Sequence, residues 1–150
     1  MKSKASNFVN IEFPSRSSNE GFARAAVACF AAQMDPTLNE LEDIKTSVSE
    51  AVTNAIVHAY PEVLGKVLLK ARICPGNTLE ILIKDHGKGI ADVEKARQPM
   101  FTTGGEERSG MGFTIMESFM DQVTVKSVPG KGTTVLLKKK IATRAKPLER

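Results

Sequence analysis

The stretch Leu79-Glu80-Ile81-Leu82-Ile83-Lys84-Asp85-His86-Gly87-Lys88-Gly89-Ile90 carries an apolar strand pattern that ends in an acidic residue and two spaced glycines. Side chains alternate between the two faces of a strand, so Asp85 points to the same side as Ile81 and Ile83, the core side. A carboxylate there is costly unless a partner satisfies it, and the glycines allow close backbone approach. A ligand with hydrogen-bond donors is one explanation, and a plain Asp-Gly turn is the other.

Further strand patterns lie on both sides of this stretch. The predicted strands are residues 8–13, 67–73, 79–85, 122–128 and 133–140. Between the second and the third, Pro75-Gly76-Asn77-Thr78 predicts a hairpin turn in which Gly76 and Asn77 can adopt positive φ. The last two strands flank a second turn sequence, Pro129-Gly130-Lys131-Gly132.

Two stretches, Ser17-Ser18-Asn19-Glu20 and Thr37-Leu38-Asn39-Glu40, have capping-box spacing. The first opens a helical pattern over residues 22–34, and the second opens a long helix that should run to about Tyr60, before Pro61. Shorter helices are predicted over 93–97 and 113–120, and the rest of 91–109 is predicted to be a long mobile loop.

The order of these elements indicates the α+β class. Helices are interspersed with hairpins instead of alternating with strands, which favours a two-layer sandwich: a largely antiparallel mixed sheet with helices on one face. A chain of 150 residues that is 41% hydrophobic can bury one sizeable core. We therefore expect a single domain over residues 1–140 and a basic, disordered tail over 141–150.

Charge and targeting signals narrow the function classes. The net charge of +4 is concentrated after residue 137, where six basic residues face one acidic residue, so the body is nearly neutral. A neutral body fits protein partners better than DNA. The chain shows neither an apolar run of the roughly 18 to 20 residues that span a bilayer nor a signal peptide, so a cytoplasmic protein is expected. Cys29 and Cys74 form no Cys-x-x-Cys pair, which indicates reduced thiols.

Two more groups of residues could carry chemistry. Glu50 and Asn54 lie one helical turn apart, roughly opposite the apolar stripe of the long helix. They could equally be part of a solvated face, although Asn in mid-helix is mildly unfavourable. Gly110-Met111-Gly112 precedes a helix, where exposed backbone N–H groups and the helix dipole suit a phosphate; a flexible hinge is the alternative.

Together these elements would form a nucleotide site in three parts. Asp85 could accept a hydrogen bond from the adenine amino group, which favours ATP over GTP because guanine offers an acceptor there. Asn54 offers an oxygen ligand suited to Mg²⁺, and Gly110 and Gly112 offer a phosphate cradle behind a movable lid.

The order of the motifs resembles a known superfamily. Glu50-x3-Asn54, Asp85-x-Gly87-x-Gly89, Gly110-x-Gly112 and Thr133-Thr134 resemble the N, G1 and G2 boxes of the ATP-binding superfamily of gyrase, Hsp90, histidine kinases and MutL. That resemblance implies the Bergerat ATP-binding fold. Three longer stretches, residues 49–56, 96–103 and 107–117, resemble the anti-sigma-F factor family of endospore-forming bacteria.

The resemblance implies a role for each matched residue. Asn54 would coordinate Mg²⁺, and Glu50 would be the general base that takes the proton from an attacking serine hydroxyl. Arg108 would neutralise charge on the γ-phosphate, although a lid surface charge is nearly as good an explanation. The remaining implied nucleotide contacts are Asp85, Gly87, Gly89, Thr102, Thr103, Ser109, Gly110, Met111, Gly112, Thr133 and Thr134.

The resemblance also implies partners. The expected function is an anti-sigma factor and ATP-dependent protein serine kinase, a homodimer that inhibits a sporulation sigma factor and phosphorylates the anti-anti-sigma antagonist on serine. Glu20 and Arg24 would contact these partners, unless they form an ordinary ion pair. A nucleotide-gated sigma-binding module without catalysis and a general-stress anti-sigma kinase are the alternatives. Gly104-Gly105 departs from the family's expected lid sequence and leaves the lid contacts open.

Overall fold

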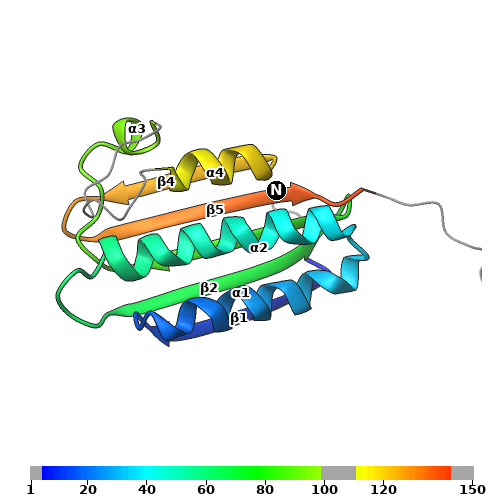
Figure 1. Cartoon of the computed structure of the whole chain (residues 1–150), viewed down its shortest axis with the longest axis horizontal. Helices are drawn as coiled ribbons and strands as arrows, with labels where there is room; N and C mark the ends of the chain where they lie inside the picture. The colour runs from blue at the N-terminus through cyan, green and yellow to red at the C-terminus, as the bar shows by residue number, and fades with distance from the viewer. Residues whose placement is uncertain (1–4, 99–110, 143–150) are drawn as a thin grey trace, which may run out of the picture.

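A computed structural model describes residues 5–98 and 111–142 of the chain, and Figure 1 shows their arrangement. The elements are β1 (Asn7–Pro14), α1 (Ser18–Ala31), the 3₁₀-helix η1 (Ala32–Met34), α2 (Leu38–Thr53), the π-helix η2 (Asn54–His58), β2 (Lys66–Cys74), β3 (Thr78–Asp85), α3 (Val93–Ala96), α4 (Gly112–Phe119), β4 (Gln122–Val128) and β5 (Gly132–Lys140). Every predicted strand and helix within these residues is present.

The five strands form one sheet in the order β1-β2-β3-β5-β4. Each pair of neighbours is antiparallel, and α1, α2 and α4 lie over one face (Figure 1). The predicted α+β sandwich is therefore confirmed. The β2–β3 turn also has the predicted backbone, since Gly76 has φ 78° and Asn77 has φ 54°.

The core lies between the sheet and the helices. Leu79, Ile81 and Ile83 of β3 are almost completely buried, and Asp85 continues this face with 6% of its surface exposed. In the register of the sheet Asp85 is opposite Val67 of β2 and Thr133 of β5. The predicted core-side position of this carboxylate is confirmed.

The start of α1 differs from the prediction. The helix begins at Ser18, directly after the predicted cap Ser17 and four residues before the predicted pattern at Phe22. The Ser17 side chain makes no capping hydrogen bond, and its backbone is already helical. Glu20 cannot complete a capping box with it. Its carboxylate instead lies 3.1 Å from the Arg24 guanidinium, as an i,i+4 pair. The predicted capping hydrogen bonds at residues 17–20 are wrong: the Glu20 N–H donates to the Ser17 carbonyl at 3.2 Å, and the Glu20 carboxylate pairs with Arg24.

The predicted cap of α2 is present. The Thr37 hydroxyl accepts from the Glu40 N–H at 3.0 Å, and the Thr37 N–H donates to the Glu40 carboxylate at 2.8 Å. The second oxygen of Glu40 accepts from the N–H of Ala142 at 2.9 Å. Because Ile141 beside it is completely buried, the packed fold extends beyond the boundary predicted at residue 140.

The far end of the long helix contains a turn that the periodicity did not predict. After Thr53 the helix widens into the π-helix η2, in which the Ala59 N–H donates to the Asn54 carbonyl at 3.1 Å. Helical backbone thus continues almost to Tyr60, as predicted, but with one extra residue in its last turn. Single π-turns of this kind are frequent at functional sites.

No helix among the described residues is both long enough and apolar enough to span a membrane.

Candidate active site

Asp85 is held at the end of β3 by two backbone donors. The N–H groups of Gly87 and Thr133 donate to the same carboxylate oxygen, Oδ1, at 2.9 and 3.2 Å. Burial raises the pKa of the Asp85 carboxyl, and these two hydrogen bonds oppose the effect of burial without cancelling it. A carboxylate fixed in this way through one oxygen can present the other as an oriented acceptor.

The glycines around Asp85 are required by close packing. A Cβ at Gly87 would lie 2.3 Å from the Ala59 carbonyl oxygen, and one at Gly89, whose φ is +77°, would lie 2.4 Å from the Val128 carbonyl oxygen. The close approaches seen here are thus to protein backbone, and the approach of these glycines to a nucleobase stays a prediction. Gly132, which sequence reasoning missed, passes Asp85 still more closely, since its Cβ would lie 2.1 Å from the Asp85 carbonyl oxygen.

The structure separates the two threonines that were both assigned to the site. Thr133 is buried and faces Asp85, whereas Thr134 lies on the opposite face of β5 because strand side chains alternate. Ser127, also missed from sequence, lies within 2.8 Å of the Thr133 hydroxyl and accepts from the Ile90 N–H at 2.7 Å. The group of polar residues around Asp85 therefore includes Ser127 and Thr133.

Glu50 and Asn54 meet the first residue of α4. A Cβ built on Gly112 would lie 3.3 Å from Glu50 Oε1 and 3.6 and 3.7 Å from Asn54 Nδ2 and Oδ1. The two helix residues therefore share one side of α2 and face the N-terminal end of α4, next to Met111. Glycine leaves room here for both polar side chains.

Five predicted site residues lie outside the described part of the chain. They are Thr102, Thr103, Arg108, Ser109 and Gly110. Among the described residues, the structure thus brings together Glu50, Asn54, Met111 and Gly112 in one group and Asp85, Gly87, Gly89 and Thr133 in another.

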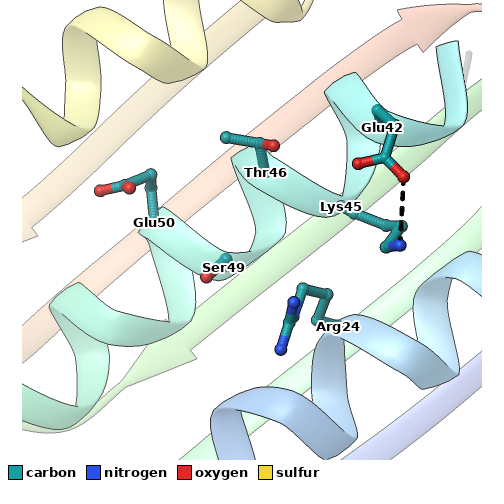
Figure 2. A pocket seen from close by; sticks show the side chains of 6 residues that line it. All are labelled: Arg24, Glu42, Lys45, Thr46, Ser49 and Glu50. Atoms are coloured by element: carbon teal, nitrogen blue, oxygen red, sulfur yellow. Dashed lines mark hydrogen bonds and ion pairs between the residues drawn. The ribbon is translucent and has the colours of Figure 1, made fainter. Parts of the chain in front are cut away.

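A pocket of about 150 Å³ lies between α1 and α2. Figure 2 shows Glu50 at one end of the α2 side and Arg24 reaching toward the pocket from α1. The remaining lining residues are Glu42, Lys45, Thr46 and Ser49. Lys45 and Ser49 were not identified from sequence, because only the packing of the two helices places them beside Arg24.

Charges around this pocket are balanced by ion pairs. Arg24 pairs with Glu20 at 3.1 Å, and Lys45 pairs with Glu42 at 3.2 Å. The Arg24 Nε and Glu20 Oε2 atoms are both buried, yet the contact lacks the geometry of a hydrogen bond. The ion pair that the sequence offered as the alternative role of Glu20 and Arg24 therefore forms.

The family model described as a histidine kinase-like ATPase domain matches residues 13–139, which sets the class of the protein. An anti-sigma F factor of Thermoanaerobacter sp. (strain X514) is 55% identical over 138 residues, covering 91% of this chain and 96% of the relative. An anti-sigma F factor of Heyndrickxia coagulans is 56% identical over 140 residues, covering 92% and 95%. The chain therefore belongs to the anti-sigma F factor family.

Solved structures share the fold at low identity. The RsbU and RsbW domains of a Mycobacterium tuberculosis protein match with a TM-score of 0.69 at 17% identity, covering 96% of this chain and 35% of that one. A histidine kinase domain from Erythrobacter litoralis matches with a TM-score of 0.56 at 20% identity, covering 81% and 61%. Membership of the histidine kinase-like ATPase family implies that the chain binds ATP or ADP.

Proposed function

We propose that this protein is an anti-sigma factor and an ATP-dependent protein serine kinase. It binds and inhibits a sporulation sigma factor, and it phosphorylates the anti-anti-sigma antagonist on serine. The observation that carries the proposal is that Arg24 and Glu50 line one pocket. Arg24, which is expected to contact a partner, and Glu50, which is expected to take the serine proton, thus line the same pocket.

The size of the pocket favours a protein substrate. Its volume of about 150 Å³ is below the roughly 300 Å³ at which small-molecule sites begin. A single side chain presented by a partner fits this space better than a whole nucleotide does. An acceptor serine entering from the Arg24 side would reach Glu50 at the far end of the pocket.

Glu50 performs the proton transfer in the proposed reaction. The serine Oγ attacks the γ-phosphorus of ATP, the bond to the β,γ-bridging oxygen breaks, and ADP leaves. The serine proton goes to the Glu50 carboxylate, which acts as general base. A Cβ built on Gly112 would lie 3.3 Å from Glu50 Oε1, which supports a base beside the helix N-terminus, where backbone N–H groups suit phosphate oxygens.

Asn54 is the proposed Mg²⁺ ligand. Its amide oxygen lies next to Glu50 at the start of α4, and oxygen is the ligand that Mg²⁺ prefers. Mg²⁺ usually takes one or two protein oxygens together with phosphate oxygens and water, so a single amide fits such a site. When bound, the ion would neutralise charge on the phosphate oxygens.

Asp85 is the proposed adenine contact. Its Oδ1 is occupied by Gly87 and Thr133, and its other oxygen would accept from the adenine amino group. Asp85→Asn keeps the first acceptor but places a donor toward that amino group. We therefore expect weaker ATP binding in calorimetry, and an unchanged ATP affinity would rule out this contact.

The lid completes the proposed site. Arg108 would neutralise charge on the γ-phosphate, and Thr102, Thr103, Ser109 and Gly110 would contact the nucleotide. These assignments rest on the family resemblance of the lid sequence. We propose a single kinase domain that includes Ile141 and Ala142, which pack against the body after β5, and a basic tail that begins after them.

The partners are proteins in this proposal. Arg24 and Glu20 would contact both the sigma factor and the antagonist, and the protein would act as a cytoplasmic homodimer without direct DNA binding. Arg24→Ala should abolish capture of both partners while ATP binding stays intact, and Arg16→Ala, an exposed arginine just before α1, is the matched control. Loss of partner binding in both variants would contradict a specific role for Arg24.

Mass spectrometry tests the kinase assignment. Wild-type protein incubated with Mg-ATP and a candidate antagonist should add phosphate to a serine of the antagonist. Glu50→Gln should lower the rate by about 100-fold or more, the usual contribution of a general base, whereas Glu62→Gln on the exposed loop should not. Sigma binding without any phosphoserine would favour a nucleotide-gated binding module, and a preference for a general-stress sigma factor would favour the related stress kinase.

A further inference from the structure

Tyr60 joins the end of the long helix to the loop that follows Asp85. Its hydroxyl donates to the Lys66 carbonyl at 2.8 Å and accepts from the His86 N–H at 2.6 Å. A phenol hydroxyl has one proton to donate. In Tyr60 this proton goes to the Lys66 carbonyl, and the hydroxyl oxygen accepts from the His86 N–H. The side chain of Tyr60 thus links β2 to the first residue after β3.

A second hydrogen bond ties the same loop to the same helix end. The Lys88 N–H donates to the Ala59 carbonyl at 3.0 Å, and Gly87 passes against that carbonyl with no room for a Cβ. Residues 86 and 88 are therefore both anchored to residues 59 and 60. Gly87, between them, is the residue whose N–H donates to Asp85 Oδ1.

The aromatic ring of Tyr60 is itself closely packed. A Cβ at Gly65 would lie 2.1 Å from the ring, so the chain after the helix passes directly against it. The π-turn at Asn54–His58 adds one residue to the last helical turn before Ala59 and Tyr60. The helix that carries Glu50 and Asn54 is thus connected to the loop that positions Asp85.

We infer that Tyr60 is a positioning residue for nucleobase recognition: its hydroxyl fixes His86, and through Gly87 it sets the orientation of the Asp85 carboxylate. The inference rests on the proposed function, in which Asp85 selects adenine. Removal of the hydroxyl frees His86 N–H, lets Gly87 shift, and loosens one of the two hydrogen bonds that orient Asp85. Contacts to the phosphates depend on α2 and α4 and remain.

Tyr60→Phe tests the inference, because it removes the hydroxyl and keeps the ring that packs on Gly65. Calorimetric dissociation constants are measured for ATP, GTP and inorganic tripolyphosphate. ATP affinity should fall about tenfold, the fold-change of one hydrogen bond, with GTP and tripolyphosphate affinities unchanged. In the kinase assay the KM for ATP should rise while kcat at saturating ATP stays constant.

A purely structural role predicts a different result. If Tyr60→Phe weakens the binding of all three ligands equally, lowers kcat through loss of folded protein, or changes none of these quantities, the inference is overturned. Thr78→Val, which removes a hydroxyl at the opposite end of β3, is the matched control and should leave selectivity intact. A wild-type protein without preference for ATP over GTP would instead refute the adenine assignment, so the two failures are distinguishable.

Discussion

Gly112→Ala should lower the rate of serine phosphorylation without lowering the stability of the fold. The added Cβ would lie 3.3 Å from Glu50 Oε1, closer than ordinary van der Waals contact, and 3.6 Å from Asn54 Nδ2. The Glu50 side chain is flexible at its tip and must move by a few tenths of an ångström. Because a displacement of about 1 Å can lower a rate about 100-fold, we expect kcat for serine phosphorylation to fall about tenfold.

The stability of the Gly112→Ala variant should not fall. Gly112 is the first residue of α4, and alanine is favoured over glycine within helices by up to about 1 kcal/mol. The free energy of unfolding should therefore stay constant or rise by less than about 1 kcal/mol. Urea denaturation measures this quantity, and quantitative mass spectrometry of the phosphorylated antagonist measures kcat on the same preparation.

The control for this experiment lies on the same helix. Ser118 is exposed and its hydroxyl donates to the Thr114 carbonyl at 3.0 Å, so Ser118→Ala changes α4 without touching Glu50. It should leave kcat unaltered. Wild-type kcat in Gly112→Ala would refute the placement of Glu50 as the base at this helix end, and so would a loss of activity fully explained by unfolding.

Three further predictions concern folding and pH. Gly132→Ala should lower the free energy of unfolding by about 3 kcal/mol or more in urea, because φ is +129° and the Cβ would collide with the Asp85 backbone; a loss below about 1 kcal/mol would contradict this. Asp85→Asn should stay as stable as wild type at pH 7 or become more stable in thermal denaturation, since burial raises the pKa of the carboxyl and makes its charge costly. Burial raises the pKa of Glu40, but hydrogen bonds from Ala142 and Thr37 outweigh burial and lower it below 4.5, so Glu40 stabilises the fold above its unfolded pKa and this stabilisation is lost as the pH falls through the folded pKa. Stability measured from pH 7 to pH 3 should therefore show the difference between wild type and Glu40→Gln shrinking with acidification, and a constant difference would contradict this sign.

Local patterns in the sequence predicted much of the fold. The alternation of Leu79, Ile81, Ile83 and Asp85 set the buried face of β3, and the Thr37 cap set the start of α2, because both depend on neighbours a few residues apart. The Ser17 cap failed for the converse reason. The Ser17 backbone is already helical, and the Asn19 N–H donates to the Arg16 carbonyl in the turn that precedes the helix. The capping rule considers only residue types and spacing, so it does not detect this backbone conformation.

The candidate site was predicted as separate pieces. Glu50 and Asn54 share a helix face by periodicity alone, but their contact with Gly112 depends on how α4 packs against α2. The pocket that joins Arg24 to Glu50 depends likewise on the packing of α1 on α2 (Figure 2). Ser127, Gly132 and Tyr60 were missed because their partners are distant in the chain.

The sequence by itself determined which segments form strands and helices, the core-side position of Asp85 and the types of chemical group in the site. These properties follow from side-chain periodicity and turn chemistry, which act over a few residues. Only the tertiary structure decided which groups meet: β5 lies between β3 and β4, and this order brings Thr133 to Asp85. The contacts of the Tyr60 hydroxyl were likewise settled by packing, because it satisfies the Lys66 carbonyl and the His86 N–H, which only the folded chain brings together.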